Sequence, residues 1–196
     1  LNWKTVARLA EMAYRCNLCR RCAQVCPIGV DNGLIARELR KLFSQEFGWK
    51  SSNITLKDCD LTAEYVFLDS RDVELDNVKM KGKYSFQYME NLTIRNSVLD
   101  TKDAFWHSKN VSVYDSVVKG EYLAWYSENV RLVRCRIIGT QPLCYCKDLT
   151  LIDCTMEGTD LSFEYSDVEA TVRGHVDSVK NPRSGHIVAD SVGGVI

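Results

Sequence analysis

The chain has 196 residues, an apolar fraction of 45%, a charged fraction of 26% and a net charge of −1, values typical of a globular protein. Three prolines and eleven glycines exclude a collagen-like or long disordered chain, and no apolar run approaches the roughly 18 residues that span a membrane. Residues 1–50 are basic and the remainder is acidic. Because the basic excess is local, we expect no nucleic-acid partner.

Residues 1–50 predict two helices separated by a loop. Apolar residues at near-helical spacing predict a helix over residues 2–15. A second helix is expected after Asp31, which has the side chain of an N-cap, with Leu34 and Ile35 on its apolar face.

The loop between these helices carries the sequence Cys16-x-x-Cys19-x-x-Cys22-x-x-x-Cys26-Pro27. Two-residue gaps let three thiolates converge on one cluster, and the whole pattern is the bacterial iron–sulfur run. Zinc is the main alternative, because C-x-x-C pairs also bind zinc. The sequence therefore predicts a metal-binding segment with a [4Fe–4S] cluster as its cofactor.

Residues 14–32 and 34–43 resemble the first cluster-binding segment of heterodisulfide-reductase-type iron–sulfur subunits. Those subunits are cytosolic electron carriers with two [4Fe–4S] clusters and act within larger oxidoreductases. The resemblance implies a redox partner subunit, and it implies that three cysteines hold one cluster and a fourth reaches a second: Cys16, Cys19 and Cys22, then Cys26. The family's second cysteine run is absent, so the second cluster is incomplete unless a partner chain or Cys59 completes it.

The other five cysteines do not form a secreted disulfide framework. Three share one phase of the repeat described below, where the neighbouring residues are apolar: Cys59, Cys135 and Cys154. We expect these thiols to be buried, and the chain to be cytoplasmic, because free cysteines fit a reducing compartment.

The larger part of the chain is a repeat. An asparagine or aspartate, followed at once by Ile, Val or Leu, recurs with a constant 19-residue period: Asn53, Asp72, Asn91, Asn110, Asn129, Asp148 and Asp167. A fixed period of this size indicates one supersecondary unit stacked on itself. The period divides the chain into a truncated helical ferredoxin-like segment, residues 1–50, and a repeat domain, residues 53–196.

Each repeat predicts short strands and no helix. Counting from the Asn or Asp as position zero, positions one and three are apolar and alternate with polar residues. Position eight is apolar, and position ten is small enough for a tight corner. The pattern predicts a mainly β fold, a right-handed parallel β-helix of 19-residue coils. Position zero should form a ladder whose amides bond neighbouring backbone, and position six an internal column of small groups: Cys59, Val78, Ser97, Ser116, Cys135 and Cys154.

Aromatic residues follow the same period. Position fourteen holds Phe67, Phe86 and Phe105, and position fifteen holds Trp106 and Trp125. Position sixteen holds a candidate ligand stripe: Tyr88, His107, Tyr126 and Tyr145. Strand alternation predicts that positions fourteen and sixteen share one face and position fifteen the other. Exposed rings of this kind can hold sugar faces; the alternative is that they shield a groove or pack on another segment.

Several segments resemble an uncharacterised bacterial family of right-handed parallel β-helices with the pectin-lyase-like superfold: residues 83–88, 99–106, 120–125, 139–145 and 179–185. The resemblance covers nearly all of residues 53–196. It implies the fold and brings no established activity.

Asp100, Asp103 and Glu121, with His107 nearby in the sequence, form the best candidate catalytic cluster. Pectin-degrading β-helices use paired carboxylates, but their Asp-Asp and Gly-His-Gly signatures are absent here. The alternative is that these are solvated turn residues. Whether the chain is an enzyme stays open, and we expect no catalysis by the chain on its own.

Two functions follow from these patterns. The first is an electron-transfer protein that binds a [4Fe–4S] cluster and uses its β-helix as a non-catalytic scaffold. The alternative is a β-helix protein of unknown function that binds carbohydrate along the aromatic stripe, with the iron–sulfur segment vestigial or an artefact of fusion. A natural fusion and a chimera remain equally open.

Overall fold

The computed structural model describes residues 8, 12, 24–25, 27–28, 30–36 and 47–196. The chain divides into two compact units, Leu1–Glu46 and Phe47–Ile196. Arg8 and Met12, within the first predicted helix, are helical. The four clustered cysteines lie outside the described residues, so the iron–sulfur segment stays a prediction.

Residues 32–36 are helical, as the sequence predicts. The backbone N–H of Leu34 donates to the Asp31 carboxylate (2.9 Å), so Asp31 is the N-cap. Leu34 and Ile35, which the sequence predicts on the apolar face of this helix, are 41% and 50% exposed. The buried side here consists of Gly33 and Ala36, which are three residues apart and so share one helix face.

The second unit consists of eleven strands. Their bounds are β1 Ser52–Thr62, β2 Arg71–Lys83, β3 Glu90–Arg95, β4 Val98–Lys102, β5 Lys109–Tyr114, β6 Val117–Lys119, β7 Glu128–Val133, β8 Arg136–Ile138, β9 Lys147–Glu157, β10 Asp167–Val176 and β11 Ser184–Val192. The long strand β2 pairs with two short strands of the next coil, β3 through its first half and β4 through its second half. Every coil therefore has a first and a second strand segment.

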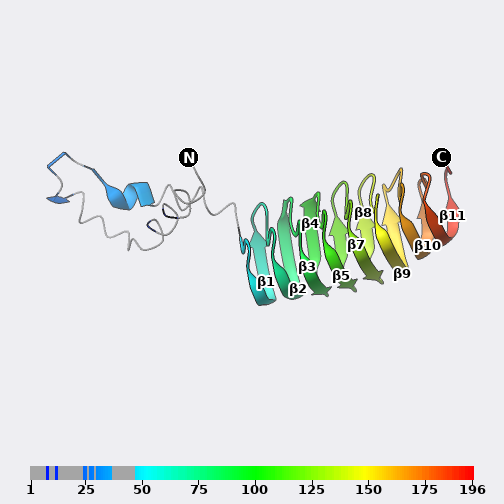
Figure 1. Ribbon diagram of the computed structural model, residues 1–196, viewed down its shortest axis with the longest axis horizontal. Coiled ribbons are helices and arrows are strands. Elements are labelled where there is room, and N and C mark those ends of the chain that lie inside the picture. Colours follow the sequence, from blue (N-terminus) through cyan, green and yellow to red (C-terminus); the bar gives the residue numbers. More distant parts are fainter. Residues whose placement is uncertain (1–7, 9–11, 13–23, 26, 29, 37–46) are drawn as a thin grey trace. The chain divides into compact units, whose positions relative to one another are not determined.

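All strand pairs of this unit are parallel, and in the regular coils the paired residues are separated by one 19-residue period. Val73 pairs with Leu92, and Leu92 pairs with Val111. The first segments of successive coils stack in one row and the second segments in another, along the axis seen in Figure 1. This is a β-solenoid of about seven coils, which confirms the predicted parallel β-helix and its period. Its right-handedness stays a prediction.

The core is built from the three predicted apolar positions. Positions one, three and eight are buried in the middle coils, for example Leu92, Ile94 and Leu99, each 0% exposed. The equivalent residues of the first coil pack against this core but are only partly buried: Ile54, Leu56 and Leu61. Because like residues stack on like residues, each coil buries its apolar face against its two neighbours.

The position-zero residues form the predicted ladder, with a correction to its bonding. Six of the seven have a left-handed backbone, with φ between +53° and +60°, which Asn and Asp adopt more readily than most residues. The Asn91 amide donates to the Asp72 carboxylate (2.8 Å). The amides of Asn110 and Asn129 each donate to the amide oxygen one coil before, at 2.9 Å. These amides therefore bond side chains; the prediction that they bond backbone is wrong, because the corner brings equivalent side chains together.

Asn110→Ala tests how much the ladder hydrogen bonds and the left-handed backbone of this corner contribute to stability. Alanine loses both ladder bonds and must keep φ near +56°, so we expect a loss of about 2 kcal/mol in the free energy of unfolding. Asn110→Gly loses the same bonds but tolerates the backbone, and we expect about 1 kcal/mol. Urea denaturation measures both. Equal losses would show that the left-handed backbone contributes nothing to the cost.

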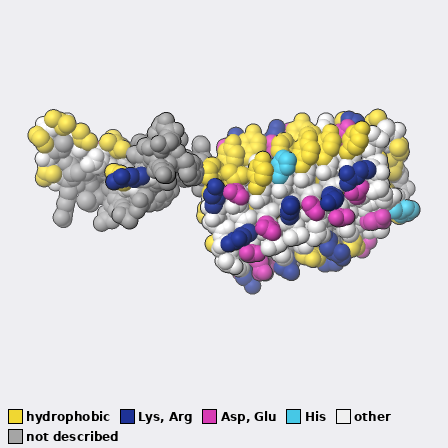
Figure 2. Space-filling model, in the orientation of Figure 1, with side chains coloured by type: hydrophobic (Ala, Val, Ile, Leu, Met, Phe, Trp, Pro, Cys, Tyr) yellow, Lys and Arg dark blue, Asp and Glu magenta, His cyan; other side chains and the backbone are white. Residues whose placement is uncertain are grey.

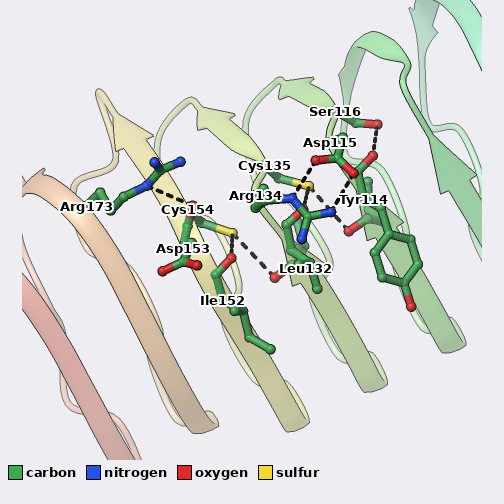
Figure 3. A network of polar contacts seen from close by, with 12 residues as sticks. Tyr114, Asp115, Ser116, Leu132, Arg134, Cys135, Ile152, Asp153, Cys154 and Arg173 are labelled. Carbon is green, nitrogen blue, oxygen red and sulfur yellow. Dashed lines mark hydrogen bonds and ion pairs between the residues drawn. The ribbon is translucent and has the colours of Figure 1, made fainter.

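A second corner, at position five, was missed by the sequence reading. Its residues also have positive φ, from +50° to +54°: Asp58, Asn77, Asn96, Asp115, Arg134 and Asp153. Asn77 donates to Asp58 (2.7 Å), and the Arg134 guanidinium donates two hydrogen bonds to the Asp115 carboxylate, a bidentate pair (2.6 and 2.7 Å). Figure 3 shows the Arg134–Asp115 pair between neighbouring coils.

The small internal column at position six is confirmed from Val78 onward, where every member is at most 4% exposed. The Ser97 and Ser116 hydroxyls donate to carbonyls of Arg95 and Tyr114, each at 2.6 Å. Cys135 and Cys154 occupy the same place, with their sulfurs near backbone carbonyls at 3.4–3.5 Å (Figure 3). Cys59 is only partly buried, because it lies in the first coil.

Candidate functional site

The aromatic residues lie on a turn segment that joins the second strand of one coil to the first strand of the next. Alternate residues of this segment have positive φ, as in Asp103 (+53°), Phe105 (+63°) and His107 (+54°). Their amides bond to both neighbouring coils: the N–H of His107 donates to the Trp125 carbonyl, and the N–H of Phe105 to the Ser85 carbonyl, each at 3.0 Å. The segment therefore stacks like a strand without having a strand's backbone.

This backbone overturns the predicted direction of the rings. Phe86 and Phe105, at position fourteen, are 0% exposed, whereas Tyr88 and Tyr126, at position sixteen, are 54% and 48% exposed. The prediction that the two positions share one face is wrong. It assumed the two-residue alternation of an extended strand, and alternating left-handed residues do not follow that rule.

The position-sixteen rings form one continuous stack. Tyr88 lies 5.1 Å from His107, and His107 lies 5.1 Å from Tyr126, with planes 7° and 8° apart. Tyr126 lies 4.8 Å from Tyr145, with planes 10° apart. Tyr165 continues the stack at 6.1 Å and 8°. We call these five residues the ring stripe.

Tyr165 was missed by the sequence reading, because the step from Tyr145 to Tyr165 is one position longer than the period of the repeat. The extra residue shifts Tyr165 out of the regular count, although the backbone realigns it with the stripe. A count that allowed one inserted residue in that coil would have found it.

The tryptophans at position fifteen flank the ring stripe. Trp106 and Trp125 stack at 5.6 Å with planes 6° apart. Their indole N–H groups donate to the carbonyls of Tyr122 (2.7 Å) and Gln141 (2.8 Å). Trp125 also meets Tyr145 edge to face at 5.5 Å. These contacts hold the rings in place, and Figure 2 shows hydrophobic side chains, tyrosines included, gathered in a band along one edge of the solenoid.

The stacking decides which part of each ring meets a ligand. Inside the stripe, both faces of a ring are covered by its neighbours. The parts left to solvent are ring edges and, on the tyrosines, hydroxyls that both donate and accept hydrogen bonds. Desolvation and the nearby Glu164 carboxylate raise the pKa of Tyr145, so its phenol stays a donor at neutral pH. The stripe therefore offers a row of phenol groups, one per coil at four of its five positions.

A polar groove of about 450 Å³ runs along the position-zero ladder. It is lined by the ladder's first four members and by the position-two side chains beside them: Asn53, Asp72, Asn91 and Asn110, with Thr55, Glu74 and Thr93. The ladder bonds occupy one amide hydrogen and one oxygen of its inner members. The other hydrogen of each inner amide remains for a polar ligand.

The structure brings two of the candidate catalytic residues together: the Asp103 backbone N–H donates to the Glu121 carbonyl of the neighbouring coil at 3.0 Å. Asp100 and Glu121 form exposed ion pairs with lysines of neighbouring coils, at 3.5 and 3.1 Å. His107 is held inside the ring stripe. Asp103 is 5% exposed; its burial and, to a smaller extent, Glu121 raise the pKa of its carboxyl. Catalysis by these groups stays a prediction.

No group of three or more His, Cys, Asp or Glu side chains able to hold a metal occurs in the parts of the chain that are described. The clustered cysteines lie outside those parts: Cys16, Cys19, Cys22 and Cys26. In the solenoid, desolvation raises the pKa of Cys144 to about 11 and that of Cys146 to about 12. These two thiols are therefore protonated and suited to packing rather than to ligating metal.

Among the described residues, no helix has the length and apolar character needed to cross a membrane. Residues 33–196 match a protein family described as "Protein of unknown function (DUF3737)". The match begins after the four clustered cysteines. No curated protein and no solved structure matches the chain significantly.

Proposed function

Since the chain belongs to DUF3737, a family of proteins of unknown function, we propose a role from its surface: it is a binding protein whose ring stripe holds an extended carbohydrate chain. The observation that carries this proposal is the unbroken stack from Tyr88 to Tyr165, with three of its tyrosines about half exposed. Ligand sites combine apolar surface with a few placed polar groups, and each phenol edge supplies both.

The geometry favours a long ligand with a repeating structure. The ring centroids are 4.8–6.1 Å apart along the solenoid axis, so equivalent groups recur at nearly constant intervals. A polysaccharide presents recurring hydroxyls and apolar C–H edges to such a row. Because the rings are held by stacking, binding orders few side chains and its entropy cost is small.

Titration with neutral hexasaccharides tests this proposal. We would measure calorimetric affinities for cellohexaose, xylohexaose and chitohexaose and for the corresponding disaccharides, and expect each hexasaccharide to bind more tightly than its disaccharide. Tyr126→Phe keeps the stack but loses a hydroxyl, and should weaken binding about threefold. Tyr126→Ala should weaken it about tenfold.

The control variant is Tyr114→Ala. Tyr114 ends β5, away from the stripe, and packs against the Arg95 guanidinium at 5.2 Å. Its replacement should leave the sugar affinity unchanged. Absence of binding to all three sugars, or an equal loss in Tyr114→Ala and Tyr126→Ala, would overturn the proposed function.

A further inference from the structure

The two end rings of the stripe, Tyr88 and Tyr165, each stack on one neighbour only, and the Tyr88 end borders a groove. Position sixteen is occupied by Asp69 one coil before Tyr88 and by Lys50 one coil before that. His107 covers one face of Tyr88, and the other face points toward the coil of Asp69. The regular stack therefore stops at Tyr88, with the place of the next ring taken by a carboxylate.

A groove of about 310 Å³ lies at this end of the stripe. Tyr88 lines it together with Lys50, Asp69, Arg71 and Glu90. Apart from Tyr88 and Glu90, its lining comes from segments 50–52 and 69–71, which belong to the preceding coils, so the groove lies on the uncovered side of the ring. Since Tyr88 is 54% exposed, its free face and its hydroxyl are accessible from the groove.

The charged groups of this groove balance in sign. Lys50 and Asp69 approach to 3.5 Å, and their side chains are 66% and 59% exposed. An ion pair so exposed is weak, so its atoms remain available to a ligand. Arg71 and Glu90 are register partners on β2 and β3. Two cations supply donors and two carboxylates supply acceptors.

We infer that this groove is a subsite for one neutral pyranose ring at the end of the carbohydrate chain, stacked on the open face of Tyr88. The inference rests on the proposed function and names the place where a sugar meets a ring face instead of ring edges. The sugar occupies the space that an aromatic side chain at position 69 would fill. Its hydroxyls bond to Asp69 and Glu90 as acceptors and to Lys50 and Arg71 as donors.

The charges argue against an anionic ligand. A uronate or a phosphate would be attracted by Lys50 and Arg71 but repelled by Asp69 and Glu90, so it gains no net advantage. Neutral hydroxyls act as donors to the carboxylates and as acceptors from the cations. The subsite should therefore prefer a neutral sugar to galacturonate.

Two pairs of variants test the subsite with cellohexaose, xylohexaose and chitohexaose as probes. Tyr88→Phe keeps the ring face and should retain affinity within about threefold, whereas Tyr88→Ala should weaken binding about tenfold. Asp69→Tyr places a ring over Tyr88 and should weaken binding about tenfold while the fold is retained. Asp69→Asn leaves the space open and should lose about threefold. Hexagalacturonate should bind more weakly than the neutral probes.

The outcomes separate this inference from the proposed function. If Tyr126→Phe weakens binding but Tyr88→Ala and Asp69→Tyr do not, the stripe binds sugar and the subsite is overturned. If hexagalacturonate binds more tightly than every neutral probe, the preference for a neutral ring is overturned. If none of the neutral probes binds, both proposals fall. Circular dichroism of each variant shows whether its solenoid is folded.

Discussion

Replacing Phe105 by alanine should lower the free energy of unfolding by about 3–5 kcal/mol, the range for deleting a fully buried aromatic side chain. Phe105 is 0% exposed and lies 5.5 Å from Phe86, which continues the column to Phe67 at 6.2 Å. On its other side the column continues with Ala124. A small side chain there cannot fill the cavity, so little of the loss is recovered by repacking.

Tyr126→Ala is the matched control for this substitution. Tyr126 and Phe105 both have a left-handed backbone, with φ of +60° and +63°, so alanine meets the same backbone strain at each position. Tyr126 is 48% exposed and loses mainly its stacking contacts, about 1 kcal/mol. Urea denaturation of the two variants compares them. Equal losses would show that the inward direction of position fourteen is wrong.

Gly139→Ala should cost about 3 kcal/mol, because the new methyl group overlaps the backbone of the preceding coil. A Cβ at Gly139 would lie 2.3 Å from the carbonyl oxygen of Gly120 and 2.7 Å from its carbonyl carbon. A backbone group cannot rotate away as a side chain does. The coils would have to separate locally, which stretches the hydrogen bonds between them.

Gly158 provides the control at the same repeat position. It has φ of +59°, and a Cβ there would meet no atom within 4 Å. Gly158→Ala should therefore cost only the backbone strain, about 1 kcal/mol. Thermal and urea unfolding of both variants would measure the difference. A Gly158→Ala loss as large as that of Gly139→Ala would contradict the close approach of the coils.

The parts of the fold that depend on repetition could be predicted from the sequence. The position-zero ladder recurs in all seven coils and each apolar position in at least six of them, so one period located the coils and the core. The second corner was missed, because Arg134 interrupts its run of Asp and Asn, and charge pairing with Asp115 replaces the amide bond.

The candidate site was predicted in its members but not in its geometry. Tyr88, His107, Tyr126 and Tyr145 stack as one row, but their direction relative to Phe105 depends on a backbone that residue type does not reveal. Positive φ in Phe and Tyr is uncommon, and here the stacked coils impose it through bonds such as that from Phe105 N–H to the Ser85 carbonyl. The open face of Tyr88 exists because residue 69, at the equivalent place one coil earlier, is an aspartate and not an aromatic residue. The sequence alone does not reveal this, because the importance of Asp69 depends on knowing that the rings stack.

The constant 19-residue period also means that whole coils can be removed from the solenoid without changing which repeat positions pair. Removing residues 91–109 would join Glu90 to Asn110 and leave every column in its order. The shortened rod would keep its corners and its interior, and Tyr88 would then meet Tyr126 directly. In such a molecule, the number of coils determines how many sugar units of the proposed ligand the stripe can span. The structure of each single coil stays the same.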